Sequence, residues 1–163
     1  MSDTRAATQT VRYRERLTVP WWWWLPGFGL AALIALEVVQ GASSIPAWAP
    51  FAVLLPVAAA VLVWLGRVEL RVVSNDTGAG AETELWVGPA HIPTSVISRS
   101  AEVPKSAKSA ALGRQLDPAA YVMHRAWVGP LLLFVLDDPE DPTPYWLVSS
   151  RHPDRVLTAL QSR

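Results

Sequence analysis

Hydrophobic positions dominate the chain between Arg16 and Arg67, where Glu37 is the one charged side chain. Two apolar stretches fill this interval, residues 20–39 and 47–65, and a short segment rich in Gly, Ser and Pro separates them. The hydrocarbon core of a bilayer is ~30 Å thick, and a helix of roughly 20 apolar residues crosses it. The pattern therefore predicts a membrane α-hairpin made of two transmembrane helices.

After residue 66 the pattern changes to an alternation of apolar and polar residues, which is typical of half-buried strands. Strands are expected at residues 67–73, 84–87, 91–98, 121–126, 130–137 and 145–149, with a turn at 74–81 and a helical turn within 105–115. Residues 153–161 begin with Pro and Asp and carry an apolar face, which predicts a C-terminal amphipathic helix. We therefore expect a small mainly-β domain, an antiparallel barrel or sandwich closed by this helix.

The segment before the first apolar stretch allows two interpretations. Residues 11–18 alternate apolar side chains with Arg and Glu, so they form either a strand that joins the β-domain or a juxtamembrane segment on the lipid headgroups. The strand is favoured. The expected organisation is a cytoplasmic N-terminal segment at 1–19, a transmembrane hairpin at 20–65 and a cytoplasmic β-domain at 66–163.

The placement of arginines predicts the orientation of the hairpin. Four precede the first apolar stretch and two follow the second: Arg5, Arg12, Arg14, Arg16, Arg67 and Arg71. The loop at residues 40–46 contains neither Lys nor Arg, and loops rich in these residues stay in the cytoplasm. We therefore expect a multi-pass protein of the plasma (inner) membrane with both termini in the cytoplasm. No small-residue cleavage motif follows the first stretch promptly, which argues against a signal peptide.

Two features of the first apolar stretch invite a functional interpretation. Residues 21–24 are four consecutive tryptophans, which favour the membrane interface and point in all directions around a helix. An anchor is therefore favoured over a quinone or lipid pocket. Glu37 is an intramembrane acid, a kind of residue that often serves in proton relays. It lies near the end of its stretch and has no ionisable neighbour in either stretch, so contact with the interface is favoured over ion transport.

The composition excludes several classes of function. Lys and Arg number 14 and Asp and Glu number 14, so no net positive field attracts nucleic acid and no such partner is expected. Cysteine is absent, which removes disulfides, thiolate metal sites and a cysteine nucleophile. His91, His124 and His152 are isolated in the sequence, and it contains no catalytic serine motif or phosphate-binding loop. We expect no enzyme activity, no metal and no cofactor.

Two groups of residues in the β-domain are candidate binding surfaces. Lys105, Lys108 and Arg114 form a basic group that would attract anionic lipid by ~1 kcal/mol per charge near the membrane surface. Ordinary solubilising charges are the alternative. The second group combines arginine with tryptophan, as protein interfaces do: Arg125, Trp127, Trp146 and Arg151. Both tryptophans of this group could equally belong to the core.

Several strings of the sequence are distinctive: RYRERLTVPWWWW, WVGPAHIPTSVI, AALGRQLDPAAYVMHRAWVGP, DPTPYWLVSSRHP and YWLVSSRHPDRVLTAL. Together with the two helices, they resemble a family of small actinobacterial membrane proteins. The tails of that family are similar to bacterial pleckstrin-homology-like (PH-like) domains. The resemblance covers most of the chain and implies a PH-like fold for the β-domain. It implies no catalytic residues, because the family has no established activity.

Two functions are compatible with these observations. The favoured one is a membrane-anchored binding or scaffolding module whose cytoplasmic domain recruits a partner, either membrane lipid or another membrane protein or complex. The alternative is a small accessory subunit of a membrane transport or redox complex that uses Glu37. The sequence predicts no particular oligomeric state.

Overall fold

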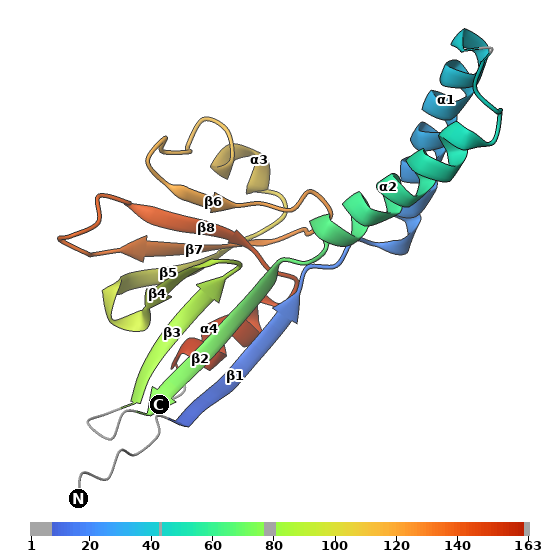
Figure 1. Cartoon of the computed structure of the whole chain (residues 1–163). Helices are drawn as coiled ribbons and strands as arrows, with labels where there is room; N and C mark the ends of the chain where they lie inside the picture. The colour runs from blue at the N-terminus through green and yellow to red at the C-terminus, as the bar shows by residue number, and fades with distance from the viewer. Residues whose placement is uncertain (1–7, 43, 77–80, 162–163) are drawn as a thin grey trace, which may run out of the picture. The chain divides into compact units, whose positions relative to one another are not determined.

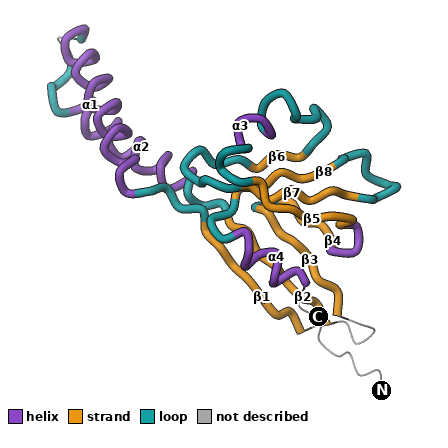
Figure 2. Tube along the Cα trace, turned by 180° about the vertical axis from the view of Figure 1, so that it is seen from behind, coloured by secondary structure: helices purple, strands orange, loops and turns teal. Residues whose placement is uncertain are grey.

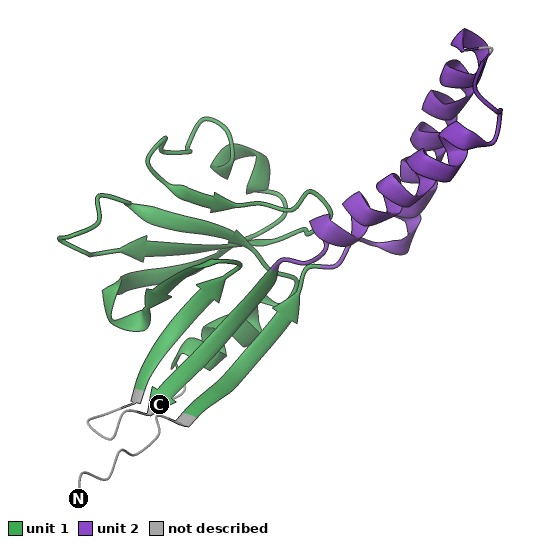
Figure 3. Cartoon of the chain, in the orientation of Figure 1, with its two compact units in different colours: residues 1–17, 69–163 green, residues 18–68 purple. Residues whose placement is uncertain are grey.

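The chain folds into two compact units in the computed structural model, which describes residues 8–42, 44–76 and 81–161. One unit comprises residues 18–68 and is entirely helical in its regular structure; it is called the hairpin unit below (Figure 3). The other combines residues 1–17 with 69–163 and contains all the strands that the structure describes; it is called the β unit. The β unit therefore draws on both sides of the hairpin unit in the sequence.

The hairpin unit consists of two helices that pack against each other along their length (Figure 1). A 3₁₀ turn at Trp21–Trp23 leads into α1 (Trp24–Gly41), and α2 (Ala49–Leu65) returns. Small side chains lie at the contact, where Ala31 and Ala35 are buried. A Cβ atom added to Gly27 would lie 3.0 Å from Cδ1 of Leu62, whereas one added to Gly29 would meet nothing within 4 Å. The small residues therefore let the two backbones approach closely.

The two helices differ in length relative to a bilayer. Within the described part of the chain, Trp21–Gly41 is the helical stretch that is long and apolar enough to cross a membrane, with 21 residues. The second predicted span, 47–65, forms the shorter apolar helix Ala49–Leu65. The structure therefore supports one membrane-crossing helix by length and composition, and the two-span hairpin stays a prediction.

The β unit contains two four-stranded sheets. The first has the order β1-β2-β3-β4 and is antiparallel throughout, with strands at Thr8–Arg16, Glu69–Asp76, Ala81–Val87 and Ala90–Pro93. The second has the order β5-β7-β8-β6, with strands at Ile97–Val103, Leu131–Leu136, Tyr145–Ser149 and Tyr121–Met123. The predicted antiparallel arrangement is wrong for one pair, because β6 runs parallel to β8; the other pairs are antiparallel.

Two helices complete the β unit. The short helix α3 (Lys108–Ala111) lies in the connection between β5 and β6, and α4 (Pro153–Gln161) ends the described chain. Figure 2 shows α4 lying across β1 and β2, with which it is in contact. The core combines buried side chains of both sheets with Val156 of α4; fully buried members include Leu17, Leu70, Leu85, Phe134 and Val148. This confirms the small mainly-β domain with a C-terminal helix.

Several predicted elements match the structure and one is wrong. Strand 145–149 and helix 153–161 form with the predicted bounds, and the favoured strand in 11–18 is part of β1. The predicted strand 91–98 is wrong, because a 3₁₀ turn at Thr94–Val96 divides it into the end of β4 and the start of β5.

Other boundaries also differ from the sequence prediction: β1 ends at Arg16, β2 begins at Glu69 and β3 begins at Ala81. Strand 121–126 is shorter than predicted, since β6 ends at Met123. The predicted turn 74–81 begins too early, since β2 continues to Asp76; residues 77–80 lie outside the described chain. The early turn formers Ser74 and Asn75 are paired with β3 in the sheet. Pairing with a neighbouring strand therefore overrides their turn preference.

Candidate binding pocket

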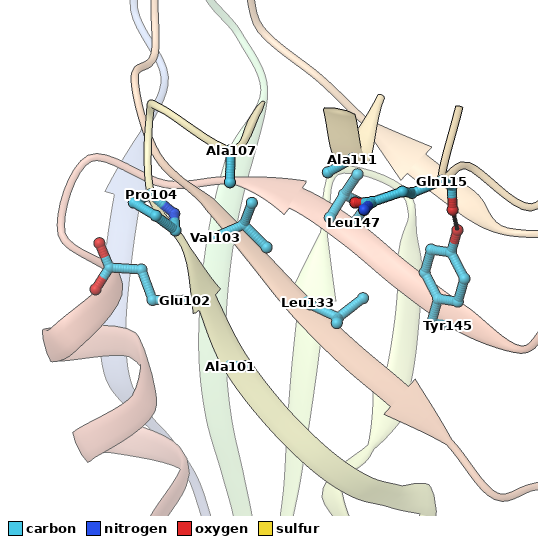
Figure 4. Close-up of a pocket in the computed structure, with 10 residues that line it drawn as sticks. All are labelled: Ala101, Glu102, Val103, Pro104, Ala107, Ala111, Gln115, Leu133, Tyr145 and Leu147. Atoms are coloured by element: carbon cyan, nitrogen blue, oxygen red, sulfur yellow. Dashed lines mark hydrogen bonds between the residues drawn. The ribbon is translucent and has the colours of Figure 1, made fainter. Parts of the chain in front are cut away.

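A pocket of about 420 Å³ lies between one face of the second sheet and the segment that carries α3 (Figure 4). Its walls come from three strands and from that segment: Ala101 and Val103 of β5, Leu133 of β7, Tyr145 and Leu147 of β8, and Pro104, Ala107, Ala111 and Gln115 of the connection. Glu102 completes the lining. The interior is mostly aliphatic, and its volume falls within the range of small-molecule sites, roughly 300–1,000 Å³.

The register of the second sheet explains why these side chains meet. Ala101 pairs with Leu133, and Leu133 pairs with Leu147, so the three side chains form one row across β5, β7 and β8. The strand alternation places their neighbours Phe134 and Trp146 on the opposite face of the sheet. Because Ala101 is small, space remains above the row.

The segment that covers the row is rich in small residues. Ala107 and Ala111 lie one helical turn apart and both line the pocket, so α3 presents methyl groups to it. The helix has only four residues and depends on other contacts to hold its place. One contact is made at the far end of the segment, where the backbone N–H of Asp117 donates to the Tyr145 hydroxyl at 2.7 Å.

Tyr145 also donates a hydrogen bond from its hydroxyl to the backbone carbonyl of Gln115, at 3.3 Å (Figure 4). The hydroxyl therefore uses both its donor and an acceptor position within the protein. No buried side-chain atom among the pocket-lining residues lacks a hydrogen-bond partner. The interior consequently offers a ligand mainly apolar contact, and the exposed amide of Gln115 is a polar group in the lining.

Lys108 has a structural role rather than a surface position. Its ammonium group donates hydrogen bonds to the backbone carbonyls of Val128 and Arg125, the latter at 3.4 Å. Burial lowers the pKa of Lys108, and the nearby charge of Lys105 lowers it further. Burial, together with the charges of Lys108 and Arg125, likewise lowers the pKa of His124. Lys108 thus fastens α3 to residues 125–128.

The predicted basic group is therefore divided by the fold. Lys108 points into the protein, while Lys105 and Arg114 are exposed. Lys105 directly follows the lining residue Pro104, and Arg114 directly precedes the lining residue Gln115. The two exposed cations lie at the two ends of the segment that covers the pocket. Contact of this pair with anionic lipid remains a prediction.

The second predicted group is also divided. Trp146 is 6% exposed and packs against the ring of Tyr121 at 4.3 Å between centroids, so it belongs to the core, the alternative left open by the sequence. The Arg125 guanidinium lies 6.0 Å from the centroid of Trp127, whose indole N–H donates to the carbonyl of Leu17 at 3.2 Å. Arg151 is exposed. Arg125 and Trp127 are the members that the structure brings together.

Sequence reasoning missed a buried carboxylate on β1. Glu15 accepts hydrogen bonds from the Ser150 hydroxyl at 2.8 Å, the backbone N–H of Arg151 at 2.7 Å and the Tyr13 hydroxyl at 3.1 Å. Burial and the Glu15 carboxylate raise the pKa of Tyr13 to about 12. The alternation in β1 places Glu15 on the same face as buried Leu17, which was an available signal. Since its acceptors are occupied, Glu15 locks β1 to the turn before α4.

An aromatic cluster on the first sheet was also missed. The rings of Trp86 and His91 stack at 4.3 Å with 14° between their planes, and the Arg71 guanidinium lies 5.7 Å from the Trp86 centroid. Glu84 accepts a hydrogen bond from the Trp86 indole N–H at 2.8 Å. Trp86 and His91 are register partners across β3 and β4, and Arg71 is the partner of Trp86 in β2. The turn at Gly88-Pro89 could have indicated the first pair.

The described residues bring no three His, Cys, Asp or Glu side chains together as a group that could hold a metal ion. The His predicted to be isolated lie on different elements, with His91 on β4, His124 after β6 and His152 before α4. The pocket beneath α3 is therefore the candidate binding site of the β unit. Its lining is mostly apolar, and Glu102 is the charged residue among those that line it.

These features define a two-unit protein with an apolar helical hairpin and a small two-sheet domain that carries a pocket. The chain belongs to the family described as protein of unknown function DUF3093, whose model matches residues 12–160. The matched residues include parts of both units. No curated protein and no solved structure matches the chain.

Proposed function

We propose that the protein is a membrane-anchored binding module. In this proposal the hairpin unit crosses the plasma membrane twice, and the β unit, with a PH-like architecture, recruits a lipid or protein partner at the cytoplasmic face. The observation that carries the proposal is the surface of the hairpin unit, which is apolar on all sides.

Apolar side chains project outward from both helices in many directions. On α1, Leu33, Ile34 and Leu36 are 57%, 45% and 48% exposed, and they point to different sides at 100° per residue. On α2, Val53 and Val61 are 61% and 48% exposed. Soluble proteins rarely expose contiguous apolar surface of this kind, so it needs lipid or another protein to cover it.

Exposed tryptophans mark the two ends of the hairpin unit. Trp21 and Trp22 precede α1 and Trp64 lies near the end of α2, so these three share one end of the helix pair; they are 77%, 51% and 67% exposed. Trp48, 69% exposed, lies at the opposite end. Indole rings favour the interface between headgroups and acyl chains, and belts at both ends are typical of a spanning segment.

Strand pairing in the β unit supports two crossings rather than one. Arg16 at the end of β1 and Glu69 at the start of β2 are register partners, and the whole hairpin unit lies between them in the sequence. If α1 alone crossed the membrane, β1 and β2 would lie on opposite sides and could not pair. A spanning α1 thus requires α2 to return; its 17 residues are about 26 Å long, at the lower limit for a span.

The arginines support a cytoplasmic β unit. Those near the membrane ends, such as Arg14, Arg16 and Arg67, all lie on the flanks of the hairpin, and residues 40–46 contain no Lys or Arg. Glu69 binds both Arg14 and Arg16, but acidic residues contribute little to the positive-inside rule.

The two-sheet architecture with a closing C-terminal helix supports a PH-like β unit, and the pocket supports a binding role. Glu37 favours this function over the accessory-subunit alternative. It lies four residues before the end of α1 with an exposed side chain, a position from which a carboxylate reaches the membrane interface. No residue of either helix within the described chain offers it a salt bridge.

The experiment uses membranes from cells that produce the tagged full chain. The membranes are washed with alkaline carbonate, the chain is extracted in mild detergent, and co-purifying lipids and proteins are quantified. We expect the chain to stay in the membrane pellet and to carry one reproducible partner. Recovery from the aqueous wash would overturn the anchor, and extraction without any reproducible partner would overturn the binding role.

The variant Glu37→Gln serves as the internal comparison. It keeps the size and shape of the side chain and removes its charge, so a snorkelling residue tolerates the change. We expect the same membrane retention and the same partner as for the parent chain. If Glu37→Gln abolished transport by a co-purified complex, the anchor proposal would be wrong and the accessory-subunit function would be supported.

A further inference from the structure

We propose that a group of basic side chains beside the loop between β6 and β7 binds a phosphate group: Lys105, Lys108, His124 and Arg125. This group is called the cationic site below, and none of its members lines the pocket. The inference deepens the proposed function and rests on it for the source of the phosphate, which is the headgroup of an anionic membrane lipid. In the bound state His124 and Arg125 contact the phosphate, and the two lysines add positive charge around it.

The fold gathers the cationic site from two separate segments of the chain. The ammonium group of Lys108 donates hydrogen bonds to two backbone carbonyls of the loop, one of them that of Arg125 at 3.4 Å. The stem of Lys105 lies against Gly129, since a Cβ atom added there would be 3.7 Å from the Cδ of this lysine. His124 and Arg125 directly follow the last residue of β6. The segment that carries α3 therefore lies along the loop.

The cationic site has no carboxylate partner within the part of the chain that the structure describes. None of its four members belongs to an ion pair, and the salt bridges of Glu69 and Glu15 go to other residues. Burial lowers the pKa of Lys108 and of His124, and the positive charges of other members of the site lower both further. Like charges therefore lie close together here, and a bound anion would relieve their repulsion.

Two nitrogen atoms of the cationic site are buried without a hydrogen-bond partner in the described chain, Nε2 of His124 and Nε of Arg125. Buried polar atoms are normally bonded, so each such atom requires an explanation. The Arg125 guanidinium has five N–H donors, and one of them donates from Nη1 to the carbonyl of His124 at 3.2 Å. A water molecule would satisfy a single nitrogen and leave the charge unbalanced, whereas an anion would do both.

The loop that holds these nitrogens lies at the surface of the β unit. Ala126 is exposed, and His124 and Arg125 are half-buried. Their side chains therefore have a short path to solvent, and a rotation of both side chains brings the covered nitrogens to a ligand outside the loop.

The donors of the cationic site suit a phosphate group better than a carboxylate. The planar guanidinium of arginine binds two phosphate oxygens at once. Protonated His124 and the ammonium group of the exposed Lys105 would donate to the remaining oxygens. A phosphate monoester offers three terminal oxygens and about −1.5 to −2 charge at pH 7, whereas a carboxylate offers two oxygens and a single charge. Several neighbouring cations therefore match the phosphate.

Trp127 connects the cationic site to the segment that leads into the hairpin unit. The Arg125 guanidinium lies 6.0 Å from the centroid of Trp127, and the Trp127 indole N–H donates to the carbonyl of Leu17 at 3.2 Å. Leu17 is the last residue of the β unit before the hairpin unit begins. In the proposed function, this segment is the one that enters the membrane, so a lipid headgroup is the available source of phosphate.

The histidine signals in NMR spectra test the site, because the chain has three histidines and one of them belongs to it. The full chain, with isotope-labelled histidine and without a histidine tag, is held in phosphatidylcholine nanodiscs with or without phosphatidic acid, a phosphate monoester lipid. Titration of each imidazole gives its pKa. We expect phosphatidic acid to raise the pKa of His124, with about tenfold higher proton affinity, because bound phosphate stabilises the imidazolium. His91 on β4 and His152 before α4 are internal controls and should respond less.

Two further arms identify the ligand and its source. Cholesteryl hemisuccinate supplies negative charge through a carboxylate, and we expect it to affect the three histidines similarly, through the general field of the membrane surface. Inorganic phosphate at about 1 mM, added to phosphatidylcholine nanodiscs, should change the pKa of His124 little, because an anchored chain meets lipid headgroups at a higher local concentration. A selective rise with inorganic phosphate and none with phosphatidic acid would contradict the lipid source.

Substitutions separate the cationic site from charge elsewhere on the β unit. Arg125→Gln removes the guanidinium and should abolish the selective rise at His124, while Arg99→Gln, at an exposed position of β5, should preserve it. Unchanged signals of the two control histidines and cooperative unfolding check the fold. Lys105→Gln changes an exposed residue, so it should reduce the rise without disturbing the fold.

The outcomes distinguish failure of the site from failure of the anchor. An equal rise of all three histidines, or an undiminished rise in Arg125→Gln, would overturn the proposal. A chain that stays in the membrane and shows no selective rise at His124 refutes the cationic site alone. A chain found in the aqueous fraction whose His124 responds to inorganic phosphate refutes the anchor and the lipid source, and leaves the phosphate site.

Discussion

The two units of this chain differ in where their apolar side chains lie, buried in one and exposed in the other. In the β unit, alternation along each strand sends apolar residues inward, and Leu70, Leu85 and Phe134 are fully buried. In the hairpin unit, α1 buries only Ala31 and Ala35 and leaves its larger apolar residues exposed. A chain of this size has enough residues to bury its core, as the β unit shows. The exposed apolar side chains of the hairpin unit therefore form the kind of surface that lipid would cover.

Polar interactions differ between the units in the same way. The β unit ties distant segments together with buried hydrogen bonds, as Glu15 does with Ser150 and Arg151 across about 135 residues. The hairpin unit instead relies on close packing at small residues, where Gly27 faces Leu62. A substitution in one unit should therefore leave the other unit intact.

Removing the largest fully buried side chain should destabilise the β unit most. Phe134→Ala deletes a ring that is 0% exposed, and such changes cost about 3–5 kcal/mol through lost burial and the cavity left behind. Denaturation of the full chain in nanodiscs measures the free energy of unfolding. Val135→Ala, on the opposite face of β7 and half-buried, should cost clearly less; equal losses would mean that Phe134 lies outside the core.

A charge on the exposed face of α1 distinguishes lipid from water around the hairpin. Leu33→Asp replaces a residue that is 57% exposed, and Asp at the centre of a spanning helix costs about 3 kcal/mol. We expect a smaller membrane-inserted fraction in cell fractionation. The matched change Val122→Asp, at a residue 37% exposed on β6, should leave that fraction unchanged. A harmless Leu33→Asp would show that water surrounds the hairpin.

Removal of the buried carboxylate of Glu15 on β1 should have the next largest effect on stability. Glu15→Ala leaves the Arg151 N–H and the Ser150 hydroxyl without their acceptor, and each lost partner of a buried group costs about 1–3 kcal/mol. The midpoint of denaturation of the β unit should fall, while membrane retention stays the same. Glu82→Ala on the exposed side of β3 provides the control and should change the midpoint little.

Gly27 and Gly29 of α1 predict a smaller, position-specific effect on helix packing. Gly27→Leu forces a side chain against Leu62, and overpacking of this kind costs about 1–3 kcal/mol. Gly29→Leu meets nothing within 4 Å and should be neutral or favourable, because leucine is the better helix former. Cross-linking of single cysteines across α1 and α2 reports the packing. Identical cross-linking of the two variants would show that Gly27 does not pack against Leu62.

The smallest expected effect is a pH dependence at the start of β2. Hydrogen bonds from Arg14 and Arg16 lower the pKa of Glu69 from 4.5 to about 2. A lowered pKa in the folded state means that this stabilisation is present above pH 4.5 and is lost as the pH falls from 4.5 to about 2. The arginines are largely exposed, so the total is ~1 kcal/mol or less. Glu69→Gln should flatten this part of the stability profile, and high salt should do the same.

Local patterns were sufficient to predict part of this architecture. The helix at 153–161 has Pro153 and Asp154 in its first turn and an amphipathic face, so its bounds could be read directly. The strand in 11–18 followed from alternation alone. By contrast, the apolar residues Ile92, Val96 and Ile97 suggested one strand across 91–98, although Pro93, Thr94 and Ser95 at the division between β4 and β5 are local turn formers. The division depends on which sheet each half joins.

The candidate pocket could not be predicted, because its parts lie far apart in the sequence. It needs the register of three strands and the position of α3, and the latter depends on Lys108 reaching carbonyls beyond residue 124. Lys105, Lys108 and Arg114 were grouped because they are close in the sequence. In the fold, the side chain of Lys108 points into the protein. Burial of Trp146 likewise depends on its partner Tyr121 in the parallel strand β6. Composition drew attention to residues 105–114, and long-range contacts decide where each side chain lies.

The most direct test of the central claim measures which side of the membrane each unit occupies. Single cysteines are introduced at Ser44, in the loop between α1 and α2, and at Ser109 on the exposed side of α3, in a chain that has no other thiol. Intact cells are treated with a membrane-impermeant maleimide before and after permeabilisation. We expect residue 44 to be labelled in intact cells and residue 109 only after permeabilisation. Labelling of residue 109 in intact cells, or of residue 44 only after permeabilisation, would contradict the account.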